Sequence, residues 1–567
     1  MFKTNLRPFL WAALGVLLFL NYQMWQKDYP ALPPGISAAG AATPALDAAA
    51  PVAAAPNAAD TPAANGTDAP VAGATAAAPA AAAATAPAET LRVTTDVLTL
   101  DISLRGGELV HALLPDYPLQ KDRPDVPVEL FRNKGAGDLY VMQTGLAGTA
   151  ADQVRPTHLA TFTSPFREFT LLEGASELRV PLTWTSPEGV TVTKTYVFRR
   201  GAYRVDLEYS VQNDSDAPFA VASYAQVKHD TPPVERSYFN VSTYAFVGPA
   251  IYDGTKYRKL KITDSDDARL NQTIKHGWLA ALQHHFVSAM IPPADKDYQY
   301  SLRVKGNEYV ASLMGPVVNV EPKTTAKIEE VLFVGPKLQK QLDAIHPELS
   351  RVADYGMLTI LSKPLFWVLE KIHAMFGNWG VAIILTTFLL KLLFYPLSEA
   401  SGKSMARMKT LAPRMKNLQE QYKDDREKLG RAMMDLYKRE KVNPAAGCLP
   451  ILIQFPVFIA FYWVLLESVE MRQAPFFGWI QDLSSRDPYF ILPIIMAGAM
   501  FLQYKLQPTP ADPVQAKVFM ILPIVMSVTF AFFPSGLVLY WVTNTVLTIA
   551  QQWNINRRIE AAAAARR

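Results

Sequence analysis

The sequence predicts a membrane protein made of an α-helical bundle with six transmembrane helices and a large antiparallel β-sandwich domain outside the cytoplasm. Three observations lead to this fold class. The chain has 567 residues, of which 50% are hydrophobic, a high share for a soluble protein of this length. Residues 91–340 alternate polar and apolar side chains, as half-buried strands do. Residues 380–553 instead contain several apolar runs of the length that crosses a bilayer.

The N-terminal segment, residues 1–30, predicts a transmembrane signal anchor. Lys3 and Arg7 precede an apolar run from Pro8 to Trp25, and such a positive flank stays in the cytoplasm. A cleaved signal peptide is the alternative, although no small-x-small cleavage site directly follows the run. Residues 31–90 consist mainly of Ala, Pro, Thr, Gly and Asp, so we expect a disordered tether.

The β-sandwich is predicted over residues 91–340. Residues 177–214, ELRVPLTWTSPEGVTVTKTYVFRRGAYRVDLEYSVQND, predict three strands joined by turns at PEG and RRG. The stretch DVLTLDISLRGGELV repeats the same alternation upstream. Cys448 is the lone cysteine, which excludes an intrachain disulfide. The domain must therefore be stabilised by its packed core.

Residues 341–379 predict amphipathic helices that lie along the membrane surface. Apolar residues recur there at helical spacing, but Asp354, Lys363, Pro364 and Glu370 interrupt them. A helix with charges at these positions fits the interface better than the hydrocarbon core.

The helical core, residues 380–553, predicts five spans that complete the six. They cover approximately residues 380–397, 449–468, 488–505, 517–533 and 535–553. The loop 398–447 is rich in Lys and Arg, which places it in the cytoplasm together with both termini. Within it, residues 399–445 predict a hairpin of two charged helices that separate near Asp424 and Asp425. Residues 554–567 form a basic cytoplasmic tail.

One lysine, Lys391, interrupts the run TTFLLKLLFYPL of the first core span. An ammonium in hydrocarbon costs about 2.5 to 17 kcal/mol, depending on the reference state. Because Lys391 lies about six residues before the expected span end at Leu397, its ammonium could snorkel to the cytoplasmic head groups. Thr387, Lys391 and Tyr395, however, are spaced i, i+4 and i+8 and so share one helix face.

Polar residues in other spans, among them Gln454 and Asn544, also map to the middle or cytoplasmic halves. One reading is hydrogen bonding between helices. The alternative is a hydrated cavity that opens to the cytoplasm and keeps Lys391 charged. The asymmetry of the polar residues favours the cavity.

The hairpin carries methionines that suggest an adaptable apolar strip. Such a strip could receive varied substrate sequences, or it could be the internal seam between the two hairpin helices. The methionines concerned are Met405, Met408, Met415 and Met433.

Enzymatic motifs are missing from the sequence. No HExxH or GxSxG pattern occurs, and SGKS, which looks like the end of a phosphate loop, has Leu397 where the first glycine should stand. We therefore predict no catalytic residues, no cofactor and no bound metal.

Four segments of the core resemble the YidC membrane protein insertases of Gram-negative bacteria. They are GNWGVAIILTTFLLKLLFYPL, LYKREKVNPAAGCLPILIQFPVFIAFYWVLL, SVEMRQAPFFGWIQDLSSRDPYFILPI and FPSGLVLYWVTN. The resemblance implies an inner-membrane protein with a periplasmic β-supersandwich. It implies that the chain inserts and helps fold membrane proteins, alone or with the Sec translocon, through a hydrophilic groove open to the cytoplasm and lipid.

The resemblance also implies which residues line the groove. Lys391 matches a position that is usually arginine in the family, and lysine keeps the charge but loses the bidentate fork. Thr387 matches a groove position on the same helix. Tyr540 and Trp541 match an aromatic pair whose second member is more often tyrosine.

The partners implied are nascent membrane proteins, the Sec translocon and membrane lipids, with ribosome contact by the tail left open and no nucleic-acid sequence recognition. The alternative function is a transporter or proton-coupled channel that uses Lys391 as its site. Such proteins usually place polar residues on both sides of the midplane and contain internal repeats, and this sequence shows neither.

Overall fold

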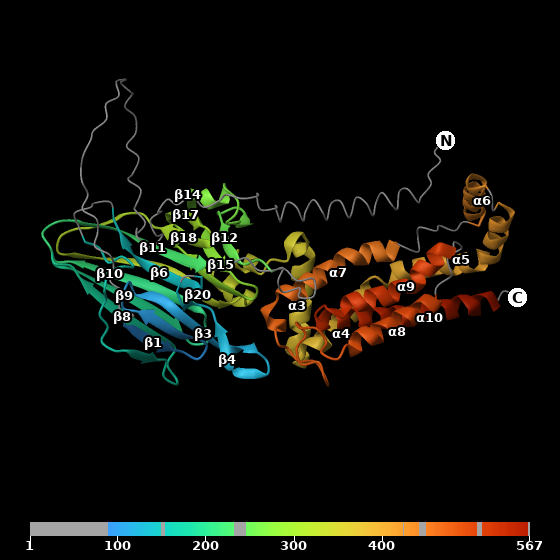
Figure 1. Cartoon of the computed structure of the whole chain (residues 1–567), viewed down its shortest axis with the longest axis horizontal. Helices are drawn as coiled ribbons and strands as arrows, with labels where there is room; N and C mark the ends of the chain where they lie inside the picture. Colours follow the sequence, from blue (N-terminus) through green and yellow to red (C-terminus); the bar gives the residue numbers. More distant parts are fainter. Residues whose placement is uncertain are drawn as a thin grey trace, which may run out of the picture.

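The computed structural model describes residues 89–135, 137–148, 154–231, 245–422, 425–440, 449–506 and 513–564. The predicted signal anchor and all but the end of the predicted tether lie outside these residues. The described chain consists of a β region from Thr90 to Pro336 followed by a helical region from Gln339 to Ala564 (Figure 1).

The β region contains two sheets. The larger sheet has twelve described strands, in the order β14-β17-β18-β11-β6-β3-β2-β1-β7 with β19, β4 and β5 paired at the side. Its strands are β1 (Thr90–Thr94), β2 (Thr99–Ser103), β3 (Glu108–Gln120), β4 (Arg123–Glu129), β5 (Arg132–Asn133), β6 (Leu139–Ala147), β7 (Glu168–Thr170), β11 (Phe219–Asp230), β14 (Asn271–Lys275), β17 (Asp297–Lys305), β18 (Glu308–Met314) and β19 (Val318–Val320).

The smaller sheet has eight described strands, in the order β13-β12-β15-β16-β20-β10-β9-β8. Its strands are β8 (Glu177–Thr185), β9 (Val190–Arg199), β10 (Arg204–Asn213), β12 (Gly248–Tyr252), β13 (Tyr257–Lys259), β15 (Trp278–Leu282), β16 (Phe286–Ile291) and β20 (Thr324–Pro336). The three strands predicted between residues 177 and 214 are therefore confirmed as β8, β9 and β10.

The two sheets pack into a sandwich around one core. Leu91 and Val93 from the larger sheet and Val192 and Leu207 from the smaller sheet are fully buried in the same apolar cluster. Described strand pairs are antiparallel except for β1 with β7. Alternation of apolar side chains produces this core, because successive residues of a strand point to opposite faces.

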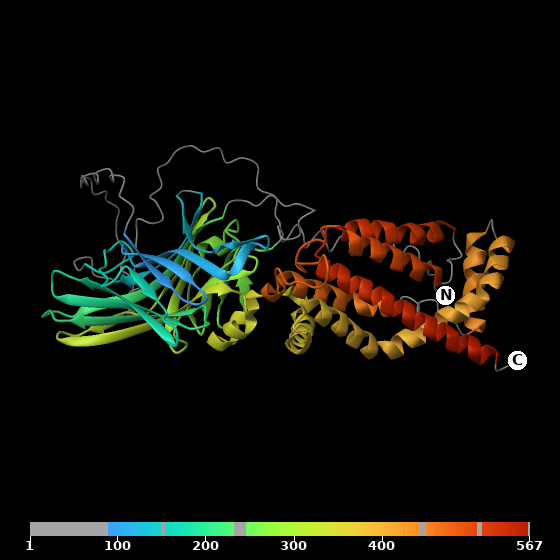
Figure 2. The ribbon, with the colours of Figure 1, turned by 90° about the horizontal axis from the view of Figure 1, so that it is seen from below.

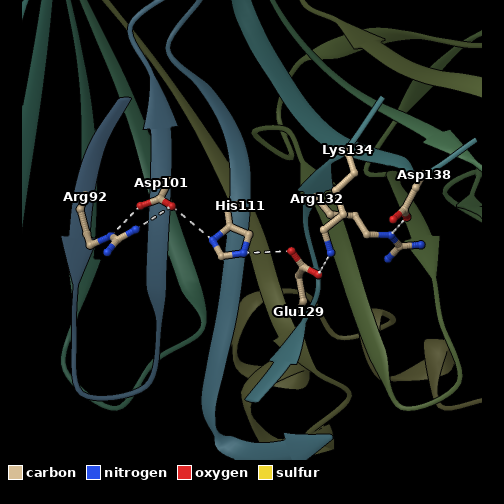
Figure 3. Close-up of polar contacts among 7 residues, drawn as sticks. All are labelled: Arg92, Asp101, His111, Glu129, Arg132, Lys134 and Asp138. Carbon is tan, nitrogen blue, oxygen red and sulfur yellow. Dashed lines mark hydrogen bonds and ion pairs between the residues drawn. The ribbon is translucent and has the colours of Figure 1, made fainter. Parts of the chain in front are cut away.

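A row of ionisable side chains crosses the outer face of the larger sheet (Figure 3). Asp101 on β2 pairs with Arg92 on β1 at 2.8 Å. His111 on β3 bridges Asp101 at 3.2 Å and Glu129 on β4 at 3.0 Å. Glu129 also pairs with Lys134 at 2.6 Å. Cross-strand pairs of this kind each contribute about 0.2 to 1 kcal/mol and favour the observed strand order.

The helical region has its own apolar core, separate from that of the sandwich. Its α-helices are α2 (Gln339–Ile345), α3 (Thr359–Phe376), α4 (Trp379–Leu393), α5 (Tyr395–Gln421), α6 (Arg426–Arg439), α7 (Leu449–Glu467), α8 (Ile491–Leu506), α9 (Pro513–Phe530) and α10 (Ser535–Ala564). Its short 3₁₀ helices are η4 (Leu349–Val352), η5 (Gly356–Leu358) and η7 (Val469–Met471).

These helices have a clear arrangement along the long axis of the molecule. The α5–α6 hairpin and the β region lie at opposite ends of the helical region (Figures 1 and 2). Helix α3 runs across the ends of the other helices on the side of the β region.

The helices α4, α7, α8, α9 and α10 correspond to the five predicted core spans. In the described part of the chain, no helix taken singly has both the length and the hydropathy needed to cross a membrane. Helix α4 together with Tyr395–Ser404 of α5 meets that test as a pair bent by 62°.

The structure corrects one predicted boundary and extends one helix beyond its predicted span. Helix α4 ends at Leu393 and not at Leu397, because Pro396 occupies the first turn of a new helix and disfavours a helical continuation from Tyr395. Helix α10 continues past the predicted span end at residue 553 and through most of the predicted tail to Ala564. The alanine-rich end of the tail favours helix strongly enough to extend it.

The β region also contacts the helical region directly. The ammonium of Lys121, in the β3–β4 turn, donates a hydrogen bond of 3.0 Å to the carbonyl of Gln473 in the loop after η7. His284 Nε2 lies 3.0 Å from the carbonyl of Leu466 near the end of α7. Within the helical region, Tyr355 and Ser468 share a hydrogen bond of 3.1 Å.

Candidate functional site

The helical region contains a groove of about 440 Å³. Six helices line it, namely α4, α5, α7, α8, α9 and α10. Its polar lining residues are Lys391, Ser398, Ser401, Gln454, Gln503, Tyr504, Asn544, Thr545, Thr548, Gln551 and Gln552. Its apolar and aromatic lining residues include Phe455, Phe458, Met500, Phe519, Leu522, Met526, Tyr540, Trp541 and Ile555. The groove can therefore accommodate a chain that carries both polar and apolar side chains.

Among the described residues that line the groove, Lys391 is the only one with a formal charge. It lies in the last turn of α4 and is 8% exposed. Its ammonium donates a hydrogen bond of 2.8 Å to Thr548 Oγ1. No Asp or Glu of the described residues lies within ion-pair distance of it. The groove thus presents a buried positive charge without a compensating carboxylate from this part of the chain.

A smaller cavity of about 10 Å³ adjoins the groove on the α4 side, a volume sufficient for about one water molecule. Thr387, Lys391, Gln454, Tyr540 and Asn544 line it together with apolar residues. The Thr387 hydroxyl donates to the carbonyl of Ile383 at 2.7 Å. That bond satisfies the hydroxyl proton within α4 and leaves its oxygen free to accept a hydrogen bond.

Most residues that the sequence singled out come together here. Lys391, Gln454, Tyr540 and Asn544 line both cavities. Thr387 lines the smaller one, and Trp541 lines the groove.

Tyr395 is the exception, because it lines neither cavity. The prediction that Tyr395 shares a helix face with Thr387 and Lys391 is wrong. The spacing i, i+8 keeps one face only in an unbroken helix, and the chain bends by 62° between α4 and α5.

Aromatic rings bound the groove toward the β region. Phe458 packs edge-on against Trp541 with ring centroids 4.9 Å apart, and Phe530 lies 5.1 Å from Trp541. Phe461 stacks on Tyr540 at 4.6 Å. These contacts leave the polar residues of α10 on the side of the α5–α6 hairpin.

The predicted methionine strip of the hairpin lines neither cavity. Met415 accepts a hydrogen bond from the Tyr437 hydroxyl of α6 at 3.9 Å, so it belongs to the seam between the two hairpin helices. Met408 and Met433 are half-buried, and the side chain of Met405 lies outside the described residues. The position of Met415 favours an internal seam of the hairpin over a strip that receives substrate sequences.

Sequence reasoning missed several groove residues. Thr548, which contacts Lys391, and Gln551 both line the groove. Asn544, Thr548 and Gln551 are spaced i, i+4 and i+7 on α10, and this spacing could have identified them. On α5, Ser398 and Ser401 could not have been found in this way, because only the bend after α4 turns them toward Lys391.

The described residues contain no group of three or more His, Cys, Asp or Glu placed to hold a metal ion.

Known proteins match nearly the whole chain. The family model "60Kd inner membrane protein" matches residues 371–562, and the model "YidC periplasmic domain" matches residues 90–368. The "Membrane protein insertase YidC" of Thioalkalivibrio sulfidiphilus is 46% identical over 572 residues, covering 98% of this chain and 99% of the relative. The chain belongs to the YidC family of membrane protein insertases.

A second YidC relative, from Nitrosococcus oceani, is 43% identical and covers 98% of this chain and 99% of its own length. A solved YidC insertase structure covers 82% of this chain with 19% identity and a TM-score of 0.38. The YidC family comprises insertases and not enzymes. Membership places the chain in the inner membrane and identifies the β region as its periplasmic domain.

Proposed function

We propose that this YidC family member inserts nascent membrane proteins by taking their hydrophilic outer segments into the groove and releasing their apolar segments into lipid. The observation that carries the proposal is the buried ammonium of Lys391, which faces a groove of about 440 Å³ without a carboxylate partner among the described residues. An acidic substrate segment supplies the missing negative charge.

Electrostatics gives the groove its role. Moving a carboxylate through hydrocarbon is costly, and a polar groove that reaches partway shortens the dry distance. Two opposite charges 4 Å apart attract by about 4 kcal/mol at an effective dielectric constant of 20. Lys391 therefore offsets part of the cost of bringing a carboxylate into the groove.

The apolar part of the substrate leaves sideways, and burial of about 20 apolar residues in lipid drives the step without a nucleotide. The outer surfaces of α8 and α9 support a lipid environment around the groove. Ile494 is 68% exposed and Ile524 is 62% exposed, which fits helices that face hydrocarbon.

The proposed topology has six spans, with both termini in the cytoplasm. The position of the α5–α6 hairpin at the end opposite the periplasmic domain supports a cytoplasmic hairpin (Figure 2). Helix α3 then lies along the periplasmic surface of the membrane. Its exposed Ile360, Trp367 and Met375 support this placement, because an interfacial helix buries one apolar face among the head groups.

The groove is proposed to open to the cytoplasm beneath the hairpin. Ser398, Ser401 and Gly402 follow the bend between α4 and α5 and line the groove on that side. The hairpin acts as the receiving surface for the nascent chain. We also propose that the protein acts beside the Sec translocon for larger substrates. Arg557 and Arg558, at the exposed end of α10, are proposed to contact the ribosome.

Photocrosslinking tests the proposed path. A bulky aromatic photocrosslinker at Trp541 replaces one ring by another and keeps Lys391 in place. The matched control is Leu389 on α4, which is 48% exposed and lines neither cavity. We expect the hydrophilic segment of a stalled nascent membrane protein to crosslink at position 541 and not at 389. Equal crosslinking of that segment from both positions would contradict a path through the groove.

A further inference from the structure

We propose that Thr548 is a positioning residue that holds the Lys391 ammonium inside the groove, where it can meet a substrate carboxylate. The inference rests on the proposed function and adds a residue to it. Thr548 acts only through Lys391 and does not itself bind the substrate.

The hydrogen bonds around Thr548 fix the direction of its hydroxyl. Thr548 Oγ1 donates to the carbonyl of Asn544 at 2.6 Å, so its proton is committed to the helix. The oxygen lone pairs can then accept the hydrogen bond of 2.8 Å from Lys391 Nζ. An ammonium has three N–H donors. Thr548 takes one of them and leaves two for an incoming acceptor.

The position of Lys391 explains why a holding contact matters. Lys391 lies two residues before the end of α4 at Leu393, on the side of the α5–α6 hairpin. A lysine near a helix end can extend its flexible stem toward the head groups. The hydroxyl of Thr548, on a different helix, opposes that movement. An arginine has a planar, preorganised fork and depends less on such a contact.

The side chain of Lys391 has a long, flexible stem with many accessible rotamers. Thr548 removes part of that freedom before the substrate arrives, and a preordered charge loses less freedom when it binds a carboxylate. The benefit is therefore specific to acidic substrate segments, which distinguishes positioning from a general role in packing.

Three variants isolate the contact. Thr548→Val keeps the shape of the side chain and removes the hydroxyl, whereas Thr548→Ser keeps the hydroxyl. The matched control is Thr543→Val. Thr543 also donates to the carbonyl four residues before it, that of Leu539 at 2.8 Å, but it lines neither cavity.

Insertion into proteoliposomes is measured for one small membrane protein with an acidic outer segment and for the same protein with its Asp and Glu changed to Asn and Gln. We expect Thr548→Val to slow insertion of the acidic form by about fivefold, in the range for losing one ordinary intramolecular hydrogen bond, and to leave the neutral form nearly unchanged. Thr548→Ser should restore the rate, and Thr543→Val should not change it.

Equal rates for Thr548→Val and Thr543→Val with the acidic substrate would overturn the inference. So would an equal loss for both substrates that Thr548→Ser does not restore. Lys391→Met separates this inference from the proposed function. If Lys391→Met inserts the acidic substrate normally, the groove charge itself has no role. If Lys391→Met is defective while Thr548→Val is not, only the positioning role is lost.

Discussion

The guanidinium of Arg472 donates a hydrogen bond of 2.8 Å to the main-chain carbonyl of Pro118 and so joins the loop after α7 to the β3–β4 hairpin. The same guanidinium lies 5.7 Å above the ring of Phe286 on β16. Gln473 Nε2 also donates to the carbonyl of Pro118, at 2.9 Å. The periplasmic domain therefore packs directly on the helical region and does not depend on the connecting residues alone.

Removal of the periplasmic domain should lower the stability of the protein but preserve its insertion activity. We expect a variant lacking residues 90–336 to insert small substrates, because every groove residue follows residue 380. Its melting temperature should fall, since Arg472 and Leu466 lose partners in the β region. Insertion assays and thermal unfolding in detergent check both points. Complete loss of insertion by a stably expressed deletion would refute the assignment of function to the helical region.

Glu470 in η7 should make stability depend on pH. Burial raises the pKa of its carboxyl from 4.5 to about 7, so the native state holds a proton that the unfolded state releases between these values. Stability should therefore fall as the pH rises from about 4.5 to about 7. Glu470→Gln should reduce this loss. Melting curves at pH 5 and pH 8 compare the two proteins, and an identical pH dependence in both would exclude Glu470 as its source.

Gly380 should tolerate no side chain, whereas Gly498 should. A Cβ at Gly380 in α4 would lie 2.0 Å from Cδ2 of Phe476, while one at Gly498 in α8 would have no neighbour within 4 Å. We expect Gly380→Ala to destabilise the protein by about 1 to 3 kcal/mol through overpacking. Gly498→Ala should stabilise it by about 0.5 to 1 kcal/mol, because alanine favours helix. Thermal unfolding of the two variants should show shifts of opposite sign.

The α5–α6 hairpin should matter as a unit more than through any single charge. Lys428 pairs with Asp425 at 3.1 Å, and its side chain is 69% exposed. Exposed ion pairs contribute only about 0 to 1 kcal/mol, so Lys428→Ala should insert substrates almost normally. Charge-neutralising substitutions at Arg426 and at Lys423 should also leave insertion almost normal. Replacing the hairpin from residue 405 to residue 445 by a short linker keeps Ser401 and Gly402 in the groove and should stop insertion. Normal insertion without this segment would show that the groove works unaided.

The fold was predictable wherever apolar residues recurred with one constant spacing along a segment. Alternating residues from Glu177 to Asn213 predicted β8, β9 and β10, because a period of two positions one face on the core. The contact of Arg472 with Pro118 was not predictable, because the two residues are 354 positions apart. An arginine guanidinium and a main-chain carbonyl are also common on protein surfaces, so neither group marked the contact. The bend after Leu393 was missed because apolar residues continue through it, although Pro396 marked it.

The groove was predictable in part, for a similar reason. Lys391 was conspicuous because a charge in an apolar run requires an explanation. Asn544 was conspicuous for the same reason, as a polar residue within a predicted span. Thr548 was not conspicuous, since a threonine in a helix usually satisfies itself against the preceding turn. Its importance depends on α4 and α10 lying side by side, which no local pattern encodes.

The most direct measurement of the central claim is the insertion rate of one substrate with an acidic outer segment by the parent protein, Lys391→Arg and Lys391→Glu, each verified as folded. We expect near-parent rates for Lys391→Arg, because the positive charge remains. We expect a strong loss for Lys391→Glu, because like charges repel, and recovery when the segment is made neutral. Equal insertion of the acidic substrate by Lys391→Glu and the parent would contradict an electrostatic role for the groove.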